Sequence, residues 1–176
     1  MSETGAIVEE TRPPRIEETF ELFRSLFSAD GGAAVTTLLR DAGTTQAHPL
    51  MRQALEIQRA HAKSIAEFAA LVGRLDQFRR AMLSFMEERD VILCPVCAFA
   101  GMAHGTTYNE ERFPAFSYTM TFNLTGWPAA VVRAGTSREG LPIGVQIAAR
   151  PWREDVALAV AQHLESELGG WQSPPR

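Results

Sequence analysis

The stretch FNLTGWPAAVVRAGTSREGLPIGVQIAARPW, residues 122–152, is the most regular part of this 176-residue chain. Two apolar runs, AAVV and IGVQIAA, flank a loop that contains Gly135, Gly140 and Pro142. Glycine and proline interrupt regular structure, so the pattern predicts two strands joined by a tight return. The apolar runs are continuous rather than alternating, and we therefore expect these strands to be buried on both faces. The polar segment FNLTG before the first run has the character of a pocket wall, which raises the question of where a catalyst would lie.

The whole chain divides into four successive parts with different patterns. They are a strand and turn at 1–15, a helical block at 16–89, a strand-loop-strand-strand-helix unit at 90–170 and a tail at 171–176. The first strand is expected at Ile7 and Val8, before a pair of prolines. This order predicts a single or partial domain with an α/β fold, in which helices cover a mixed sheet of few strands.

Apolar residues recur at helical spacing throughout the helical block. The expected helices span 16–29, 33–40 and 49–89. The second helix is expected to end at a glycine cap, Gly43. The third is either one bent helix or two helices in series, with a pause near Gly73, because glycine weakens a helix interior. Residues 98–118 show no period, and we expect them to form a long ordered loop.

Composition and charge exclude several classes of partner. The net charge is −4 and the basic residues are scattered, so we expect binding to neither nucleic acid nor a membrane surface. The acidic N-terminus lacks the apolar region of a signal peptide. Cys94 and Cys97 are too close in sequence to staple a fold, and the expected compartment is reducing and cytoplasmic.

The motif CPVC, from Cys94 to Cys97, is the first candidate for chemistry. A reactive Cys-x-x-Cys opens a helix, but the following AFAGMAHG is a poor helix start. A zinc site would have His104 as a third ligand and no evident fourth, so two cysteines at the end of a buried strand are the favoured interpretation. The sequence contains no G-x-S-x-G, P-loop, G-x-G-x-x-G or H-E-x-x-H motif, and we expect no metal and no cofactor. A Ser-His-Asp triad assembled from distant positions stays open.

Four segments together resemble the C-terminal part of the amidase signature family, the serine hydrolases that cleave carboxamides. They are DVILCPV at 90–96, FNLTGWPAAVV at 122–132, GLPIGVQIAARPW at 140–152 and EDVALAVAQHLE at 154–165. The resemblance implies the C-terminal portion of an amidase-signature-type fold and one side of an acyl-binding pocket. Within that pocket it predicts a substrate-binding role for Thr119, Phe122 and Asn123. Asn123 could equally form a turn by bonding its own backbone.

The catalytic part of the family pattern has no counterpart in this sequence. Family members are much longer chains that use a lysine and two serines in a Gly/Ser-rich segment. This chain has no two successive serines, and its single lysine, Lys63, lies in a helical pattern and matches no catalytic position. No catalytic residue is therefore assigned, and we expect no amide hydrolysis by the chain alone, whether it is a split gene product, a fragment or a relic.

The expected partners follow from this missing half. An N-terminal amidase half could complete the enzyme, and the pair would then bind a small-molecule amide. Alternatively, an exposed apolar sheet edge would favour self-association. Two other functions stay open, a non-catalytic binding or structural oligomer module and a thiol-redox protein that uses Cys94 and Cys97.

Overall fold

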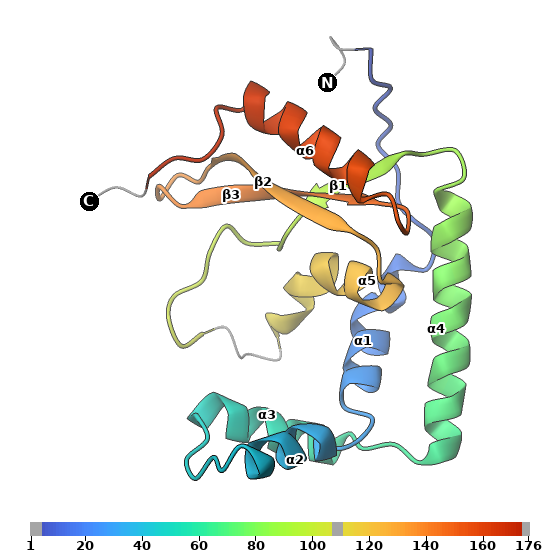
Figure 1. Cartoon of the computed structure of the whole chain (residues 1–176), viewed down its shortest axis with the longest axis vertical. Helices are drawn as coiled ribbons and strands as arrows, with labels where there is room; N and C mark the ends of the chain where they lie inside the picture. The colour runs from blue at the N-terminus through green and yellow to red at the C-terminus, as the bar shows by residue number, and fades with distance from the viewer. Residues whose placement is uncertain (1–4, 107–110, 174–176) are drawn as a thin grey trace.

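The chain folds as a small antiparallel sheet with helices on both of its faces and a helical extension to one side (Figure 1). A computed structural model describes residues 5–106 and 111–173. Along the chain the elements are η2 (Ile16–Glu18), α1 (Thr19–Phe27), α2 (Ala33–Asp41), α3 (Pro49–Ala60), α4 (Ile65–Phe85), β1 (Val91–Pro95), η3 (Phe113–Phe116), α5 (Ser117–Thr125), β2 (Ala129–Thr136), β3 (Pro142–Ala149) and α6 (Glu154–Glu167).

The sheet has the strand order β1-β3-β2, and both neighbouring pairs are antiparallel. Ile147 of β3 lies opposite Leu93 of β1 and Ala130 of β2. The α/β fold and the three later strands are confirmed. The expected mixed sheet is not: within the described ranges every strand pair is antiparallel. A tight return such as the one between β2 and β3, where Gly140 has φ 83°, joins only antiparallel strands.

The expected burial on both faces holds only for residues 146–149 of β3, and no residue of β2 is buried. Ile147 and Ala148 are completely buried, whereas Val131 is 54% exposed and Ile143 39% exposed. Helix α6 contacts β2 and β3, and the core beneath the sheet reaches Ala148. Strand β2 lies at an edge of the sheet, and its side chains are therefore only partly covered.

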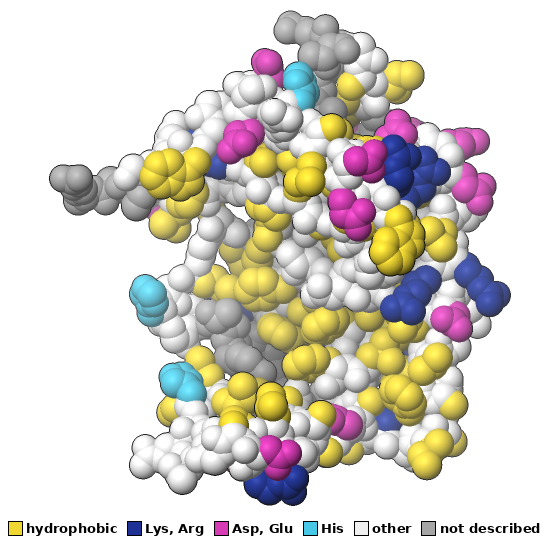
Figure 2. Space-filling view, in the orientation of Figure 1, with side chains coloured by type: hydrophobic (Ala, Val, Ile, Leu, Met, Phe, Trp, Pro, Cys, Tyr) yellow, Lys and Arg dark blue, Asp and Glu magenta, His cyan; other side chains and the backbone are white. Residues whose placement is uncertain are grey.

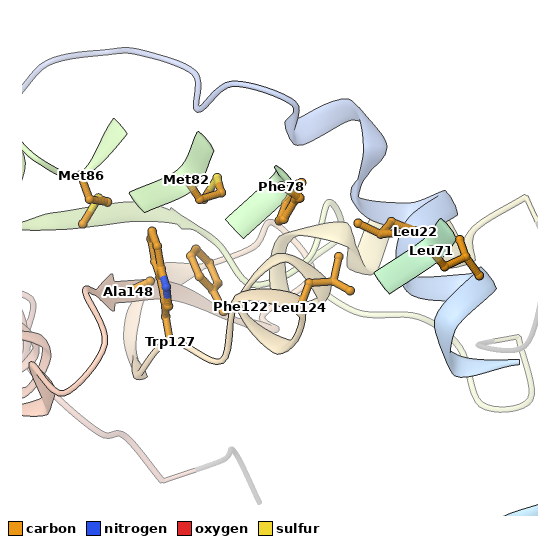
Figure 3. Packing of buried hydrophobic residues seen from close by; sticks show 9 residues of the cluster. All are labelled: Leu22, Leu71, Phe78, Met82, Met86, Phe122, Leu124, Trp127 and Ala148. Carbon is orange, nitrogen blue, oxygen red and sulfur yellow. The ribbon is translucent and has the colours of Figure 1, made fainter. Parts of the chain in front are cut away.

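The core joins the long helix α4 to α1, α5 and the sheet (Figure 3). Its centre is a row on one face of α4, where Phe78, Met82 and Met86 have no exposed surface. The other members are Leu22, Leu71, Phe122, Leu124, Trp127 and Ala148. Residues spaced by four lie on one face of a helix, and this row therefore fixes the side of α4 that meets the rest of the chain.

The long helical pattern of residues 49–89 forms two helices in series, α3 and α4. The break lies at residues 61–64, and the pause expected at Gly73 is wrong, because Gly73 sits inside α4. Ser64 begins α4 with a capping box: its hydroxyl accepts from the Glu67 amide at 3.3 Å, and the Glu67 carboxylate accepts from the Ser64 amide at 2.8 Å. Such a cap satisfies amides that the first helical turn leaves unpaired, so it sets the boundary more strongly than one glycine.

Replacing Ser64 by alanine is expected to lower the free energy of unfolding by about 1 kcal/mol, because the cap is lost. Urea unfolding followed by circular dichroism measures this change. The hydrogen bonds from Ser64 also lower the pKa of Glu67. Their contribution is therefore present above the ordinary range of a carboxyl group and is lost as the pH falls through the lowered pKa. Ser84→Ala, an exposed change in the last turn of the same helix, is the control, and an equal loss in both variants would contradict the role of the cap.

The strand expected at Ile7 and Val8 is not formed. Residues 6–13 belong to no helix or strand, and Ile7 is 99% exposed and Val8 61% exposed. A strand satisfies its amides and carbonyls only beside another strand, and no described strand lies beside this segment. An ion pair of 2.8 Å between Glu9 and Arg89 ties the segment to the turn that leads into β1.

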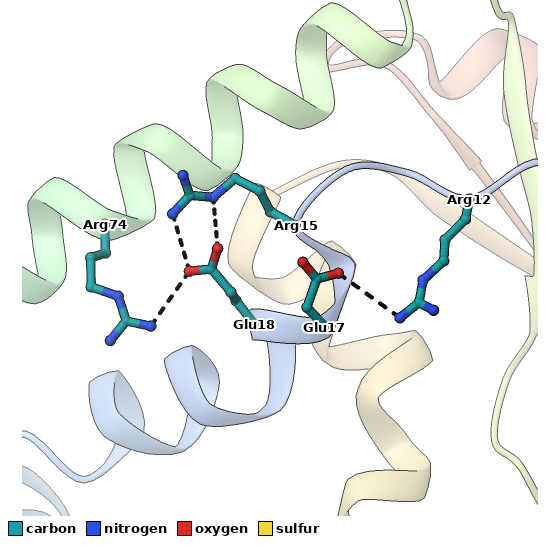
Figure 4. A network of polar contacts seen from close by, with 5 residues as sticks. All are labelled: Arg12, Arg15, Glu17, Glu18 and Arg74. Carbon is teal, nitrogen blue, oxygen red and sulfur yellow. Dashed lines mark hydrogen bonds and ion pairs between the residues drawn. The ribbon is translucent and has the colours of Figure 1, made fainter.

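Further ion pairs fix the start of η2 against α4 (Figure 4). Glu18 accepts hydrogen bonds from Nη2 of Arg15 at 3.1 Å and from Nη2 of Arg74 in α4 at 3.5 Å. Arg12 and Glu17 approach to 3.9 Å nearer the surface. Ion pairs therefore hold the N-terminal segment from Glu9 onward, while Ile7 and Val8 before them stay exposed.

Candidate functional site

Helix α5 carries all three residues that are predicted to bind substrate. Its sequence SYTMTFNLT is rich in threonine and aromatic residues, which have modest helix propensity, so the sequence alone predicts no helix here. The helix ends at Gly126, which has φ 71°, a left-handed conformation that favours glycine, and Pro128 follows two residues later. This glycine-proline pair is the signal in the sequence from which the helix could have been found.

Two helices hold α5 through buried polar contacts. The hydroxyls of Thr121 in α5 and Thr19 in α1 lie 3.1 Å apart, and both residues are buried. Arg79 of α4 donates from Nε to the carbonyl of Leu124 at 2.7 Å. That contact satisfies a carbonyl of the last helical turn, which has no partner inside the helix.

The sheet fixes the other end of α5 through Gln146, which is 4% exposed. Its Nε2 donates to the carbonyl of Tyr118 at 3.3 Å and to Sγ of Cys94 at 3.4 Å. Buried amides of this kind are costly unless they are hydrogen-bonded, so these partners hold the side chain in place. Helix α5 is thus positioned from three sides, as a rigid element that carries a binding site should be.

Thr119 and Asn123 lie one turn apart on the outer face of α5, and Phe122 points the other way. Asn123 is exposed, and Thr119 is half-buried with its hydroxyl donating to the carbonyl of Phe116 at 2.9 Å. Phe122 is 6% exposed, and its ring centroid lies 6.5 Å from that of Trp127 in the core. The structure therefore brings Thr119 and Asn123 together on the outer face of α5 and places Phe122 in the core behind them. The substrate-binding role of the three residues stays a prediction.

A cavity of about 560 Å³ opens between α1, α3 and η3. Such a volume is typical of sites for small molecules. Aromatic rings of Phe20, Phe23 and Phe113 line it together with the polar side chains of Arg24 and His61. Figure 2 shows hydrophobic side chains gathered around the hollow between the sheet and the helices α2 and α3. The arrangement suits an apolar group that carries a polar end.

The sequence did not single out the phenylalanines of α1 as cavity residues. Phe20, Phe23 and Phe27 share a helical stripe with Leu22 and Leu26, and the pattern predicts only one buried face. In the structure Leu22 enters the core and Phe20 lines the cavity, while Phe23 lines the cavity and also packs against the core. A helix that is apolar around most of its circumference is the signal for two packed faces.

Lys63 takes part in no arrangement among the described residues that could activate a nucleophile. It stands in the linker between α3 and α4 rather than inside a helix as predicted, and its amide donates to the carbonyl of Ala29 at 3.0 Å. The hydroxyl of its neighbour Ser64 is engaged with Glu67. A lysine acts as a base for a serine only within hydrogen-bond reach, and Lys63 has no such contact in the described part of the chain.

Cys94 and Cys97 lack the surroundings of a reactive pair. Both are free thiols, and a bend rather than a helix follows them. Burial raises the pKa of the Cys94 thiol, and the hydrogen bond from Gln146 only partly opposes this shift. Reactive cysteines have a lowered pKa, usually at a helix N-terminus, so the geometry is that of a packed residue at the end of a strand.

Alkylation of Cys94 by iodoacetamide at neutral pH is expected to be at least about tenfold slower than alkylation of a free cysteine, because the raised pKa reduces the thiolate fraction. Mass spectrometry of both cysteines over time measures the rates, and the same assay in urea should abolish the difference. Rapid, selective labelling of Cys94 in the folded chain would contradict this expectation.

Neither a metal centre nor a membrane span is evident in what the structure describes. No three His, Cys, Asp or Glu side chains in residues 5–106 and 111–173 gather to hold a metal ion. His104 is exposed on its loop, and His48 caps α3 by accepting from the Leu50 amide at 3.2 Å. Among the described helices, none combines the length and apolar character that crossing a bilayer requires.

Comparison with known proteins connects these features to one family. The family model described as "Amidase" matches residues 1–158. Fatty-acid amide hydrolase 2 of Homo sapiens is 31% identical over 104 residues, which are 56% of this chain and 18% of that protein. Fatty-acid amide hydrolase 2-B of Danio rerio is 24% identical over 197 residues, with 98% of this chain and 36% of that protein covered.

A solved structure gives the same picture for the fold. 6-Aminohexanoate cyclic dimer hydrolase complexed with substrate superposes with a TM-score of 0.78 at 22% identity, covering 98% of this chain and 40% of that chain. The chain therefore spans about a fifth to two fifths of the length of these three proteins.

Proposed function

The chain belongs to the amidase signature family, and we propose that it supplies the C-terminal part of a carboxamide hydrolase. In this proposal it contributes the core, part of the sheet and one wall of the substrate pocket, while the catalytic lysine and serines come from another part of the enzyme. The observation that carries the proposal is that a match over residues 1–158 corresponds to at most about two fifths of the full-length proteins.

The geometry around α5 supports the role of a pocket wall. Thr119 and Asn123 present a hydroxyl and a carboxamide on the outer face of a helix that α1, α4 and β3 hold in place. An amide substrate offers both a donor and an acceptor, and the carboxamide of Asn123 can complement both. Phe122 would act from behind, by keeping the helix in position.

The nearby aromatic cavity supports an apolar acyl or amine group on the substrate. Phe20, Phe23 and Phe113 supply a surface that favours such a group over water. We propose a small-molecule amide as the substrate class. The two unpaired thiols fit the reducing, cytoplasmic compartment that completes this proposal.

A non-catalytic oligomer module is the second candidate function. It is favoured by large apolar side chains that the chain leaves exposed, including Phe27, Leu38 and Val131, which are 58%, 68% and 54% exposed. Exposed apolar patches mark interaction surfaces. Such a module would bind a partner but would not restore amide hydrolysis to it.

Complementation separates the two candidates. An amidase N-terminal half that carries the Lys-Ser-Ser segment, and stops where the match to this chain begins in a full-length relative, is co-expressed with the chain as a separate polypeptide. Hydrolysis of a panel of aryl and alkyl carboxamides is then measured. Activity that requires both polypeptides supports the proposal, and binding without activity favours the module.

In the active pair, Asn123→Ala is expected to lower kcat/KM by about fivefold or more, because one hydrogen bond to the substrate is worth roughly 1 kcal/mol or more. Gln77→Ala is the matched control, since Gln77 is an exposed carboxamide on α4, away from α5. Equal activity of the two variants would remove Asn123 from the pocket.

A further inference from the structure

The N-terminal segment at residues 6–12 forms no helix or strand and lies outside the proposed pocket. No backbone hydrogen bond joins residues 7–12 to another described residue, and Ile7 is 99% exposed. Exposed backbone groups and β-branched side chains are the features of a strand that has no neighbour. The family match nevertheless begins at residue 1, so the segment lies inside the matched range and not in an added tail.

The sequence of the segment specifies the surroundings that it would need. Ile7 and Val8 are consecutive, and consecutive side chains of a strand point to opposite faces of a sheet. Burying both therefore requires a sheet that is covered on both faces, which is the position of an interior strand in an α/β fold. Within the described chain both side chains face solvent instead.

The ion pair that anchors the segment lies near β1, whose outer edge has no partner among the described strands. Glu9 binds Arg89 at 2.8 Å, and Arg89 donates to the carbonyl of Phe85 at 3.1 Å while its guanidinium covers the Phe85 ring at 4.2 Å. Arg89 precedes β1 by two positions, and β1 pairs only with β3 among the described strands. Figure 1 shows the N-terminal segment passing the junction of α4 and β1. An incoming sheet at this end could therefore meet both the segment and the free edge of β1.

We propose that residues 6–12 dock as a strand into the sheet of the polypeptide that carries the remainder of the amidase fold. This inference rests on the proposed function, in which that polypeptide exists. The amount of missing fold supports this occupant, because 98% of the chain superposes on only 40% of a longer family structure. The larger share of that structure has no counterpart here, and it can supply a sheet covered on both faces.

A second copy of this chain fits the segment less well. At this end it would offer the edge of β1, which has five residues and ends at Pro95. Proline lacks an N–H donor, so the edge provides fewer hydrogen bonds than a seven-residue segment can use.

Hydrogen–deuterium exchange on the complete chain tests the docking, with the separately expressed amidase N-terminal half as the probe. Adding the half is expected to slow exchange of the amides of residues 7–12 by about tenfold or more, because a strand ladder protects them. Ile7→Asp is expected to weaken binding of the half by about tenfold or more, since it places a charge in a buried apolar position. Ile65→Asp is the matched control and should bind as the unaltered chain does, because Ile65 is another isoleucine that is 90% exposed.

The outcomes separate this inference from the proposed function. An active pair in which residues 7–12 stay unprotected, or in which Ile7→Asp and Ile65→Asp weaken binding equally, overturns the docking and leaves the function standing. A half that binds but gives no amide hydrolysis, with residues 7–12 protected, supports the docking and rejects the function. Protection of residues 7–12 in a dimer of the chain alone, detected by sedimentation, overturns the choice of partner, and failure of the half to bind overturns both.

Discussion

The purified 176-residue chain is expected to give no covalent adduct with a fluorophosphonate serine probe and no amide hydrolysis above background. The sequence has no two successive serines, and its single lysine, Lys63, stands in a linker beside a serine whose hydroxyl is engaged in a helix cap. Loss of the nucleophile lowers kcat by about 10⁶-fold in a serine hydrolase that has been dissected residue by residue. An effect of that size leaves no measurable activity, so the assay gives a clear answer.

A full-length amidase carried through the same labelling reaction is the positive control, and heat-denatured chain is the negative control. Stoichiometric labelling of a serine in the folded chain would show that a nucleophile is assembled from residues to which no catalytic role is assigned here. Mass spectrometry of the labelled peptide would then identify it. Labelling that appears only after the N-terminal half is added fits the proposed function, provided that the modified serine lies in that half.

Truncation of Phe78 to alanine is expected to lower the free energy of unfolding by about 3–5 kcal/mol. Phe78 has no exposed surface and is the largest side chain of the row on α4 that contacts α1, α5 and the sheet. Removing the ring would leave a cavity where these elements meet, and they could not close it without moving apart. Urea unfolding measures the loss, and small domains have a total stability of only about 5–15 kcal/mol.

Phe68→Ala is the control because it removes the same ring from the same helix at a position that is 46% exposed. A loss of about 1 kcal/mol or less is expected there. If both variants lost the same stability, the core would not be centred on the inner face of α4. If Phe78→Ala failed to fold, near-ultraviolet circular dichroism and Phe78→Leu would distinguish a cavity effect from loss of the fold.

Elements with strong local signals could be predicted from the sequence. The hairpin of β2 and β3 follows from two apolar runs and the glycine at its turn, and Gly43 ends α2 as expected, with its amide donating to the Arg40 carbonyl at 2.9 Å. The boundary at Ser64 has an equally local signal, the capping box, but the break in the helical pattern is predicted near Gly73 instead. A single glycine costs a helix about 1 kcal/mol, which the packing of α4 outweighs.

The candidate site was harder to predict because its parts depend on contacts across the chain. Helix α5 has weak intrinsic propensity, and its threonine contact to α1 joins residues 102 positions apart. The direction of each side chain on α5 follows from that packing, so Phe122 and Asn123 could not be separated in the sequence. The cavity likewise depends on α1 meeting α3.

The sequence by itself determined the family and the order of most elements, because motifs, turn residues and periodicity act over a few positions. Only the tertiary structure decided that 117–125 is a helix, that Thr119 and Asn123 share its outer face, and that residues 6–12 have no strand partner among the described residues. The physical reason is the same in each case. Which face of an element is buried, and whether a strand can form, depends on a neighbour that is distant in the sequence, and for residues 6–12 we propose that this neighbour belongs to another polypeptide.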